Sequence, residues 1–227
     1  MLGMLRHSAS VPPSGRFLAM VLTRTANLAL IDSNMKSTRP YEMRARADAA
    51  AQTRERIMAA AIELANEKPI NALVLPDVAT RAEVSVQTVL RLFGSRDGLL
   101  DAATESALES VRAERDVAPG DVAAAVGTLF DHYEVRGDGV LLLLGQERWE
   151  PRAAEITSAG RLLHREWVEG VFAPFLARDG ERDATVDLLV AASDVYTWKL
   201  WRRDRCLSRP DAEARMLRLI GNILEGI

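Results

Sequence analysis

Apolar and polar positions between residues 75 and 100 alternate with the spacing of two short helices and the start of a third. The apolar positions that would face inward are Val78, Ala79, Ala82, Val84, Val89, Leu92 and Phe93. Two short helices joined by a tight turn form a helix-turn-helix, whose second helix enters the major groove of DNA. The pattern therefore predicts a protein that reads nucleic acid.

The residues at the expected helix ends support this layout. Pro76 suits a first helical turn, and Asp77 beside it complements the positive end of that helix. Ser85 is expected to cap the second helix, and Ser95 a third helix that starts at Arg96.

The second helix leaves six side chains on its outer and leading face, namely Ser85, Val86, Gln87, Thr88, Leu90 and Arg91. Arginine pairs well with guanine and glutamine with adenine, so we expect Val86, Gln87 and Arg91 to face base edges. Ser85 and Thr88 are expected to bind phosphates. Leu90 offers no hydrogen bond, and its only possible base contact is with a thymine methyl group.

Arg96 stands in the first turn of the third helix, where a cation opposes the helix dipole at a cost of about 0.3–1 kcal/mol. A phosphate bound at this helix end would make the arginine favourable instead of costly. Beside a helix-turn-helix we expect Arg96 to bind phosphate; the alternative is an ordinary solvated arginine.

Residues 1–34 show no clear period, and Pro12-Pro13 with Ser14-Gly15 would interrupt a helix. We expect a disordered extension, or a true translation start at Met35. A weak signal peptide, with Arg16 before the apolar run 17–22, is a rival interpretation.

Residues 35–50 form a basic lead-in that contains Lys36, Arg39, Arg44 and Arg46. We expect Arg44 and Arg46 to contact DNA from an arm that reaches phosphates or the minor groove. The alternative is a solvated tail without a fixed partner.

Residues 101–227 are expected to form a helical body. Asp121 would cap its first helix, 137–139 would be a loop, and 140–144 a buried helix. Pro151 would open a long helix, a loop would follow at 178–180, and helices would cover 184–203 and 210–224.

Composition suits an all-α protein, because only 5% of the 227 residues are aromatic and alanine and leucine are abundant, and the 48% of hydrophobic residues are enough for a full core. The net charge of −3 is unevenly spread: residues 36–100 hold 10 basic and 8 acidic residues, whereas 101–227 hold 16 basic and 23 acidic. A mildly basic head on an acidic body would orient the protein toward phosphate.

Signs of catalysis are absent from the sequence. It has no glycine-rich phosphate loop and no CxxC, HExxH or GxSxG motif, and His164-Arg165-Glu166 lacks the spacing of metal ligands. The single Cys206 fits a reducing cytosol. We therefore expect a cytoplasmic protein without enzymatic activity, cofactor or metal.

Taken together, the helix-turn-helix residues resemble the tetracycline-repressor (TetR) family of bacterial transcription regulators over about residues 53–103. The matching residues are Ile57, Ala60, Ala61, Leu64, Val78-Ala79, Val84-Ser85, Thr88-Val89, Phe93, Ser95-Arg96-Asp97 and Leu99-Leu100. The resemblance implies a DNA-binding head on an all-helical body that senses a ligand and dimerises.

Three residues depart from the family pattern. Glu83 stands where the family has a turn glycine, and a positive φ there costs roughly 1 kcal/mol. Leu90 replaces a frequent tyrosine and Leu75 a frequent threonine or serine, so two contacts to DNA would be lost.

The resemblance also implies an effector pocket and a dimer interface in the body. Candidate pocket residues are Phe130, His132, Tyr133, Trp149, His164, Trp167 and Phe172. The alternative is that they are plain core residues and ordinary histidines. The helices at 184–203 and 210–224 would pair with their copies in a homodimer, or else pack only within one subunit.

The sequence thus predicts an all-α fold, with a helix-turn-helix domain at 51–100 and an effector-binding and dimerisation domain at 101–227. The predicted function is that of a ligand-responsive repressor that binds a palindromic operator as a homodimer. The alternative is a helical small-molecule-binding protein that has lost operator recognition.

Overall fold

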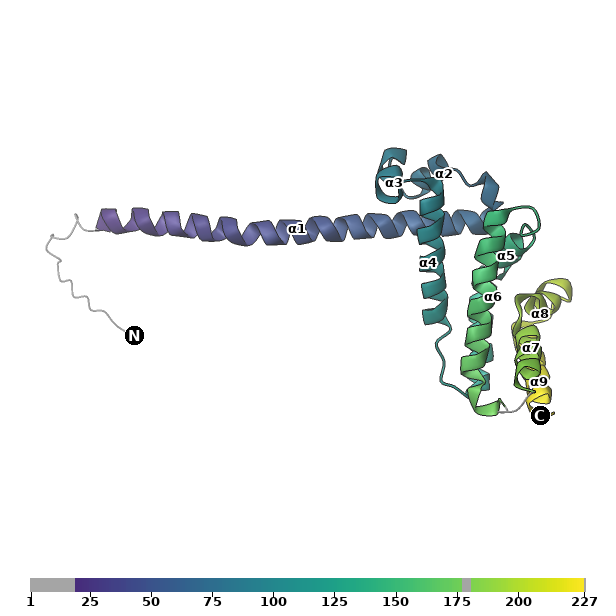
Figure 1. The fold of residues 1–227 in the computed structure, drawn as a ribbon. Helices are drawn as coiled ribbons and strands as arrows, with labels where there is room; N and C mark the ends of the chain where they lie inside the picture. The colour runs from purple at the N-terminus through teal and green to yellow at the C-terminus, as the bar shows by residue number, and fades with distance from the viewer. Residues whose placement is uncertain (1–18, 177–180, 227) are drawn as a thin grey trace, which may run out of the picture. The chain divides into compact units, whose positions relative to one another are not determined.

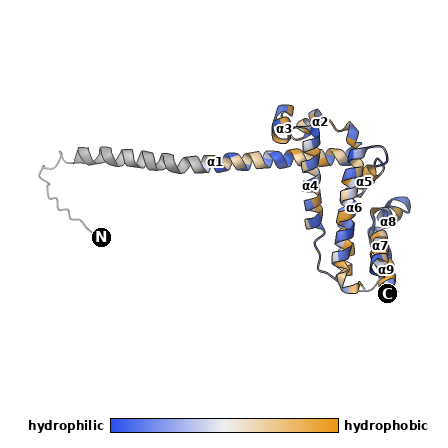
Figure 2. Cartoon of the chain, viewed as in Figure 1, coloured by the Kyte–Doolittle hydropathy of each residue, from blue (hydrophilic) through white to orange (hydrophobic). Residues whose placement is uncertain are grey.

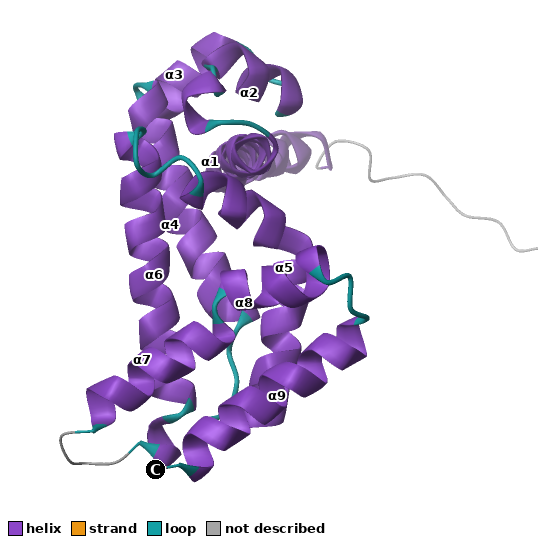
Figure 3. Cartoon of the chain, turned by 90° about the vertical axis from the view of Figure 1, so that its right-hand side faces the viewer, coloured by secondary structure: helices purple, strands orange, loops and turns teal. Residues whose placement is uncertain are grey.

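The computed structural model describes the backbone of residues 19–176 and 181–226, and side chains within these ranges from residue 41 on, except residue 42. These ranges contain helices and loops but no strand, which confirms the predicted all-α class (Figure 3). The chain divides into two compact units, Met1–Gln52 and Thr53–Ile227. None of the described helices is both long and apolar enough to cross a membrane.

Helices follow one another along the chain as labelled in Figure 1. Their bounds are α1 Ala19–Glu67, η1 Ile70–Ala72, α2 Leu75–Arg81, α3 Val86–Phe93, α4 Arg96–Glu114, α5 Val122–Leu144, α6 Pro151–Val171, η2 Ala173–Phe175, α7 Arg182–Ser193, α8 Val195–Lys199, η3 Leu200–Asp204 and α9 Arg209–Glu225.

The N-terminal segment differs from the sequence-based expectation. Residues 19–34 belong to α1 rather than to a disordered extension, and the basic residues of 35–50 lie on the same helix. Residues 19–39 contain neither glycine nor proline, so no residue there disfavours a helix strongly. The expectations for residues 1–18 fall outside the described residues, and the proposed start at Met35 stays a prediction.

The head consists of the end of α1, η1, α2, α3 and the first turns of α4. Its core contains the predicted inward residues, with Val78 and Val89 fully buried and Leu92 and Phe93 packed against it. The helix starts are also as predicted. Ser85 Oγ accepts the N–H of Thr88 at 3.1 Å, and Ser95 Oγ accepts the N–H of Gly98 at 3.0 Å.

The turn between α2 and α3 carries the expected backbone strain, because Glu83 has a φ of 55°. Only glycine adopts this left-handed conformation without a steric cost. The turn nevertheless closes, since the N–H of Val84 donates to the carbonyl of Ala79 at 2.9 Å. The departure from the family pattern therefore leaves the helix-turn-helix geometry in place.

The body packs α5, α6, α7, α8 and α9 around a second core centred on Trp198, Phe130 and Phe172. Helix α6 contacts α4, α5 and α7, and α7 contacts α9 (Figure 3). Hydrophilic and apolar residues share each of these helices (Figure 2), as expected where one face packs and the other meets water.

The predicted loop at 137–139 is wrong, because α5 continues through both glycines. A Cβ at Gly137 would lie 2.6 Å from the ring of Trp198, and one at Gly139 would overlap the side chain of Asn66. These glycines therefore allow close approach of neighbouring side chains instead of breaking the helix.

The predicted helix at 184–203 is divided into α7, α8 and a π-helical turn, η3. Asp194 ends α7 in an extended conformation, and its carboxylate caps α8 by accepting the N–H of Tyr196 at 2.8 Å. In η3 the N–H of Arg205 reaches back to the carbonyl of Leu200 at 3.0 Å.

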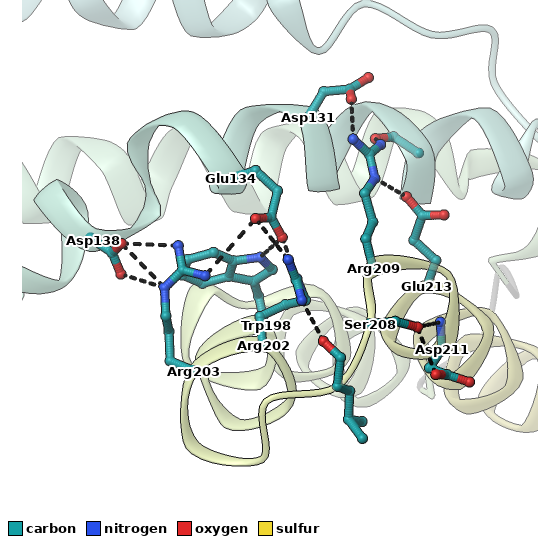
Figure 4. Close-up of polar contacts among 12 residues, drawn as sticks. Asp131, Glu134, Asp138, Trp198, Arg202, Arg203, Ser208, Arg209, Asp211 and Glu213 are labelled. Carbon is teal, nitrogen blue, oxygen red and sulfur yellow. Dashed lines mark hydrogen bonds and ion pairs between the residues drawn. The ribbon is translucent and has the colours of Figure 1, made fainter.

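Ion pairs hold this corner of the body to α5 (Figure 4). Arg202 Nε lies 2.5 Å from Glu134, Arg203 Nη2 lies 2.9 Å from Asp138, and Arg209 Nη1 lies 2.7 Å from Asp131. Trp198 Nε1 also donates to Glu134 at 3.2 Å. These contacts position α8 and α9 against the helix that carries Gly137.

We predict that Gly137→Ala destabilises the protein by about 1–3 kcal/mol, because the added methyl group must displace the Trp198 ring. Gly127→Ala on the same helix is the matched control: its Cβ meets nothing within 4 Å, so stability should rise by up to about 1 kcal/mol. Urea denaturation followed by circular dichroism measures both, and equal stability of the two variants would contradict the packing role of Gly137.

Candidate functional site

The outer face of α3 is open in the described part of the chain. Ser85, Gln87, Leu90 and Arg91 are exposed, and Val86 and Thr88 are half-buried. Neither Gln87 nor Arg91 has a hydrogen bond or ion pair with another described residue, so both side chains are available to a ligand. Ser85 and Thr88 hydroxyl oxygens lie 2.9 Å apart at the start of the helix.

Arg54 fixes the other end of α3, which the sequence alone did not indicate. Its guanidinium lies 4.4 Å from the ring centre of Phe93, and Nη1 donates to the carbonyl of Leu92 at 3.2 Å. The cation is attracted to the aromatic face of Phe93, and it is also attracted to the negative C-terminal end of the helix dipole. Together with the buried Val89, Arg54 holds α3 in a fixed orientation on the head.

Arg96 forms contacts within the head that the sequence did not indicate. Its Nε donates to the carbonyl of Leu73 at 2.7 Å, and its Nη2 donates to the carbonyl of Ile70. The guanidinium therefore turns back onto η1 and satisfies two backbone acceptors between α1 and α2. These bonds give Arg96 a positioning role in the head, and its expected contact with phosphate stays a prediction.

Gln146 ties the same segment to the body. The N–H of Ile70 donates to Gln146 Oε1 at 2.8 Å, and Gln146 Nε2 donates to the carbonyl of Leu142 at 2.7 Å. Gln146 is buried between α5 and α6. Arg152 at the start of α6 adds an ion pair of 2.5 Å with Asp101 on α4.

Arg44 and Arg46 lie exposed on α1, in the unit Met1–Gln52. Their expected contact with DNA stays a prediction.

A cavity of about 480 Å³ lies between α1, α4, α5, α6 and the start of α8. Most of its wall is apolar and includes Ala61, Ile62, Ala65, Leu100, Ala103, Leu108, Val111, Val140, Leu144, Ile156 and Leu163. Its polar lining includes Arg115, His132, Tyr133, Thr157, His164 and Asp194. A mostly apolar wall with few polar groups is typical of small-molecule sites.

Of the seven residues predicted for the pocket, His132, Tyr133 and His164 line this cavity. Phe130 and Phe172 are fully buried in the body core, and Trp149 is 69% exposed, so the structure places these three elsewhere. Trp167 lies behind the wall, where its ring stacks on His164 at 5.7 Å and its Nε1 donates to the carbonyl of Arg115 at 2.9 Å.

The two cavity histidines are neutral at neutral pH. Burial and the charge of Arg115 lower the pKa of His164 to about 3 and that of His132 to about 4. His164 Nδ1 lies 3.3 Å from Arg115 Nη1, which can only donate, so Nδ1 is the acceptor. His164 Nε2 then carries the proton and faces Ser193 Oγ at 3.2 Å.

Arg115 is the polar residue that sequence reasoning missed. It is only 5% exposed, and its Nε has no hydrogen-bond partner among the described residues. In the sequence it is one of several charged residues at the end of a helix, where arginine normally reaches solvent. Only the packing of α4 against α5 and α6 places it at the cavity.

Comparison with known proteins supports the sequence-based resemblance. Residues 57–103 match the model described as "Bacterial regulatory proteins, tetR family". No curated protein matches the chain. The resemblance to the tetracycline-repressor family is thereby confirmed for the DNA-binding head.

Several solved structures share the fold at low sequence identity. A transcriptional regulator from Rhodococcus sp. Rha1 is 22% identical with a TM-score of 0.59, and the match covers 76% of this chain and 96% of that one. A tetR-family regulator from Streptomyces coelicolor is 16% identical with a TM-score of 0.59 over 76% and 79% of the two chains. A putative TetR-family regulator from Rhodococcus sp. is 19% identical, also with a TM-score of 0.59, over 76% and 99%.

We predict that Arg96→Ala lowers the free energy of unfolding by about 1.5–3 kcal/mol, because two backbone carbonyls lose a charged donor. Arg91→Ala is the control and should change stability by less than about 0.5 kcal/mol, since it is exposed. Urea denaturation measures both. A phosphate contact would give a different result. Stability would be unchanged, and the slope of log binding constant against log salt concentration for DNA would fall in magnitude by about one.

Proposed function

We propose that this chain, whose residues 57–103 carry the DNA-binding domain of the tetR family of bacterial regulatory proteins, represses transcription from a palindromic operator as a ligand-responsive homodimer. The observation that carries the proposal is the exposed outer face of α3, with Gln87 and Arg91 available on a helix that Ser85 caps at its start and Arg54 holds at its end.

In the proposed complex α3 lies in the major groove. Arg91 pairs with guanine and Gln87 with adenine, since each side chain matches the two edge groups of that base. Leu90, 36% exposed, contacts a thymine methyl group. Arg44 and Arg46 bind phosphates or the minor groove, which adds affinity without adding sequence preference.

Two heads are needed for a palindromic operator, and the exposed apolar residues of α7 and α9 support a homodimer. Leu188 and Ala191 on α7 and Leu219 on α9 are exposed, whereas Leu189 and Met216 of the same helices are buried in the body core. Apolar side chains that stay exposed beside a complete core suit a two-fold interface in which they pack on their copies.

The ligand response follows from the position of the cavity. Helices α1 and α4 of the head and α5 and α6 of the body share its wall, so a ligand that fits one arrangement better shifts the population toward it. Half-sites one turn apart require heads about 34–36 Å apart, and another spacing weakens operator binding. The proposed regulator acts in the cytoplasm, where bacterial DNA lies, and involves no catalytic step.

A helical small-molecule-binding protein without operator recognition is the second candidate. Its support is Leu90, an apolar side chain on the reading face, together with Leu75, which cannot cap α2 onto a phosphate, and Glu83, which strains the turn with a φ of 55°. A gel shift with the promoter region of its own gene separates the two candidates: the absence of any shift at low salt favours the second.

We predict that Arg91→Ala weakens binding to operator fragments selected from genomic DNA by about 1–3 kcal/mol and relaxes the sequence preference. The control is Arg112→Ala, an exposed arginine of α4 that pairs with Glu166 in the body. Fluorescence anisotropy with selected and random duplexes measures both. An equal loss on the two kinds of duplex would place Arg91 at the DNA backbone.

We predict that Leu188→Glu combined with Leu219→Glu converts the dimer into monomers, because charges would be buried in the interface. Val135→Glu on α5 is the control: Val135 is 81% exposed and should tolerate the charge without dissociation. Sedimentation velocity reports the oligomeric state. A double variant that still sediments as a dimer would exclude the α7–α9 interface.

A further inference from the structure

The ligand cavity contains a buried cation without a carboxylate partner. Arg115 follows the last residue of α4, is almost fully buried, and lies in the cavity wall. Its Nη1 contacts the neutral His164, and its Nε has no partner among the described residues. A guanidinium cannot give up its proton under ordinary conditions, so this group remains charged.

The other arginines of the cavity wall are neutralised. Arg136 Nη2 lies 2.5 Å from Glu114, Arg161 Nη1 lies 2.7 Å from Glu147, and Arg165 Nη1 lies 2.5 Å from Asp187. Within the described residues, Arg115 is the arginine of this wall that forms no ion pair.

Nearby carboxylates are already bound elsewhere. Glu114 accepts hydrogen bonds from Arg136 and from His132, and Asp194 caps α8. The rings of Tyr133 and Trp167 lie 5.2 and 6.0 Å from the Arg115 guanidinium and offset part of its charge. A ring face does not satisfy an N–H that points along the guanidinium plane, so Nε still lacks an acceptor.

We propose that the cavity binds a small organic acid, with its carboxylate on Arg115 and its apolar body along the wall of α1, α4, α5 and α6. The inference deepens the proposed ligand response and rests on it. Arg115 is part of the cavity wall, and a guanidinium presents paired donors that match a carboxylate.

The apolar wall determines the rest of the ligand. Ile62, Leu100, Val111, Leu144 and Leu163 offer no hydrogen bond, so a polar ligand group placed against this part of the wall would be buried without a partner. The site therefore favours carboxylates that carry a hydrocarbon chain or an aromatic ring over small anions without apolar surface, such as inorganic phosphate.

Isothermal titration calorimetry on the full chain tests the proposal with octanoate and 4-phenylbutyrate and with the amide of each. Acid and amide share shape and apolar surface but differ in charge. At least one acid should bind about tenfold or more tightly than its amide, which is the advantage of a single charged hydrogen bond. Equal affinities for each acid and its amide, or no binding of either acid at millimolar concentration, would overturn the proposal.

Substitutions assign that preference to Arg115. Arg115→Gln should remove the difference between acid and amide, whereas Arg115→Lys should keep part of it because the charge remains. Arg161→Gln is the matched control, since Arg161 lines the same cavity but already pairs with Glu147. If Arg115→Gln does not fold, the test uses Arg115→Lys. An undiminished preference of this variant for the acid over the amide would overturn the role of the paired guanidinium donors.

A separate DNA-binding assay keeps this inference distinguishable from the proposed function. Calorimetry with the acids needs no operator, and selection of genomic fragments needs no acid. A chain that selects DNA fragments but binds acid and amide equally would retain the proposed function and refute the organic-acid ligand. A chain that prefers the acid but binds no DNA would retain the organic-acid ligand and refute the proposed operator binding.

Discussion

The backbone of Ile70 is the point on which the arrangement of head and body depends. Its N–H donates to Gln146 of the body and its carbonyl accepts from Arg96 of the head, so one peptide segment is fixed from both sides. Its side chain is buried in the head core and also lines the cavity. A buried peptide group that lost either partner would be costly, which makes this junction hard to loosen without unfolding.

This junction gives a physical route from the proposed ligand site to the proposed DNA-binding surface. The cavity is bounded by Ile70, by α1 and α4 of the head, and by α5 and α6 of the body. A ligand that changed the separation of these helices would act on Ile70 and, through Arg96, on the start of α4 directly after α3. Coupling of this kind requires only that the ligand prefer one of two arrangements.

The cavity concentrates features that a protein core ordinarily avoids. It combines empty volume, a buried unpaired guanidinium and two histidines whose pKa values are lowered by burial. Elsewhere in the described body the charges that join α5 to η3 are paired, as Glu134 with Arg202 and Asp138 with Arg203 show (Figure 4). Local departures from good packing and pairing are typical of functional sites, where the missing partner is supplied by a ligand.

Local rules were sufficient for the head: spacing of Val78 and Val89, the caps Ser85 and Ser95, and the strained Glu83 were all predicted from residues close in sequence. They failed where distant segments meet. Gly137 indicated a loop, but it lies in a helix with the Trp198 ring against it, and nothing near Arg96 in the sequence indicated its bonds to Ile70 and Leu73. The sequence by itself determined the short helices of the head and the polar face of α3, because those properties depend on neighbours within one or two turns. Only the tertiary structure decided that Arg115, rather than an exposed Trp149, lies at the cavity, because burial depends on which helices pack together.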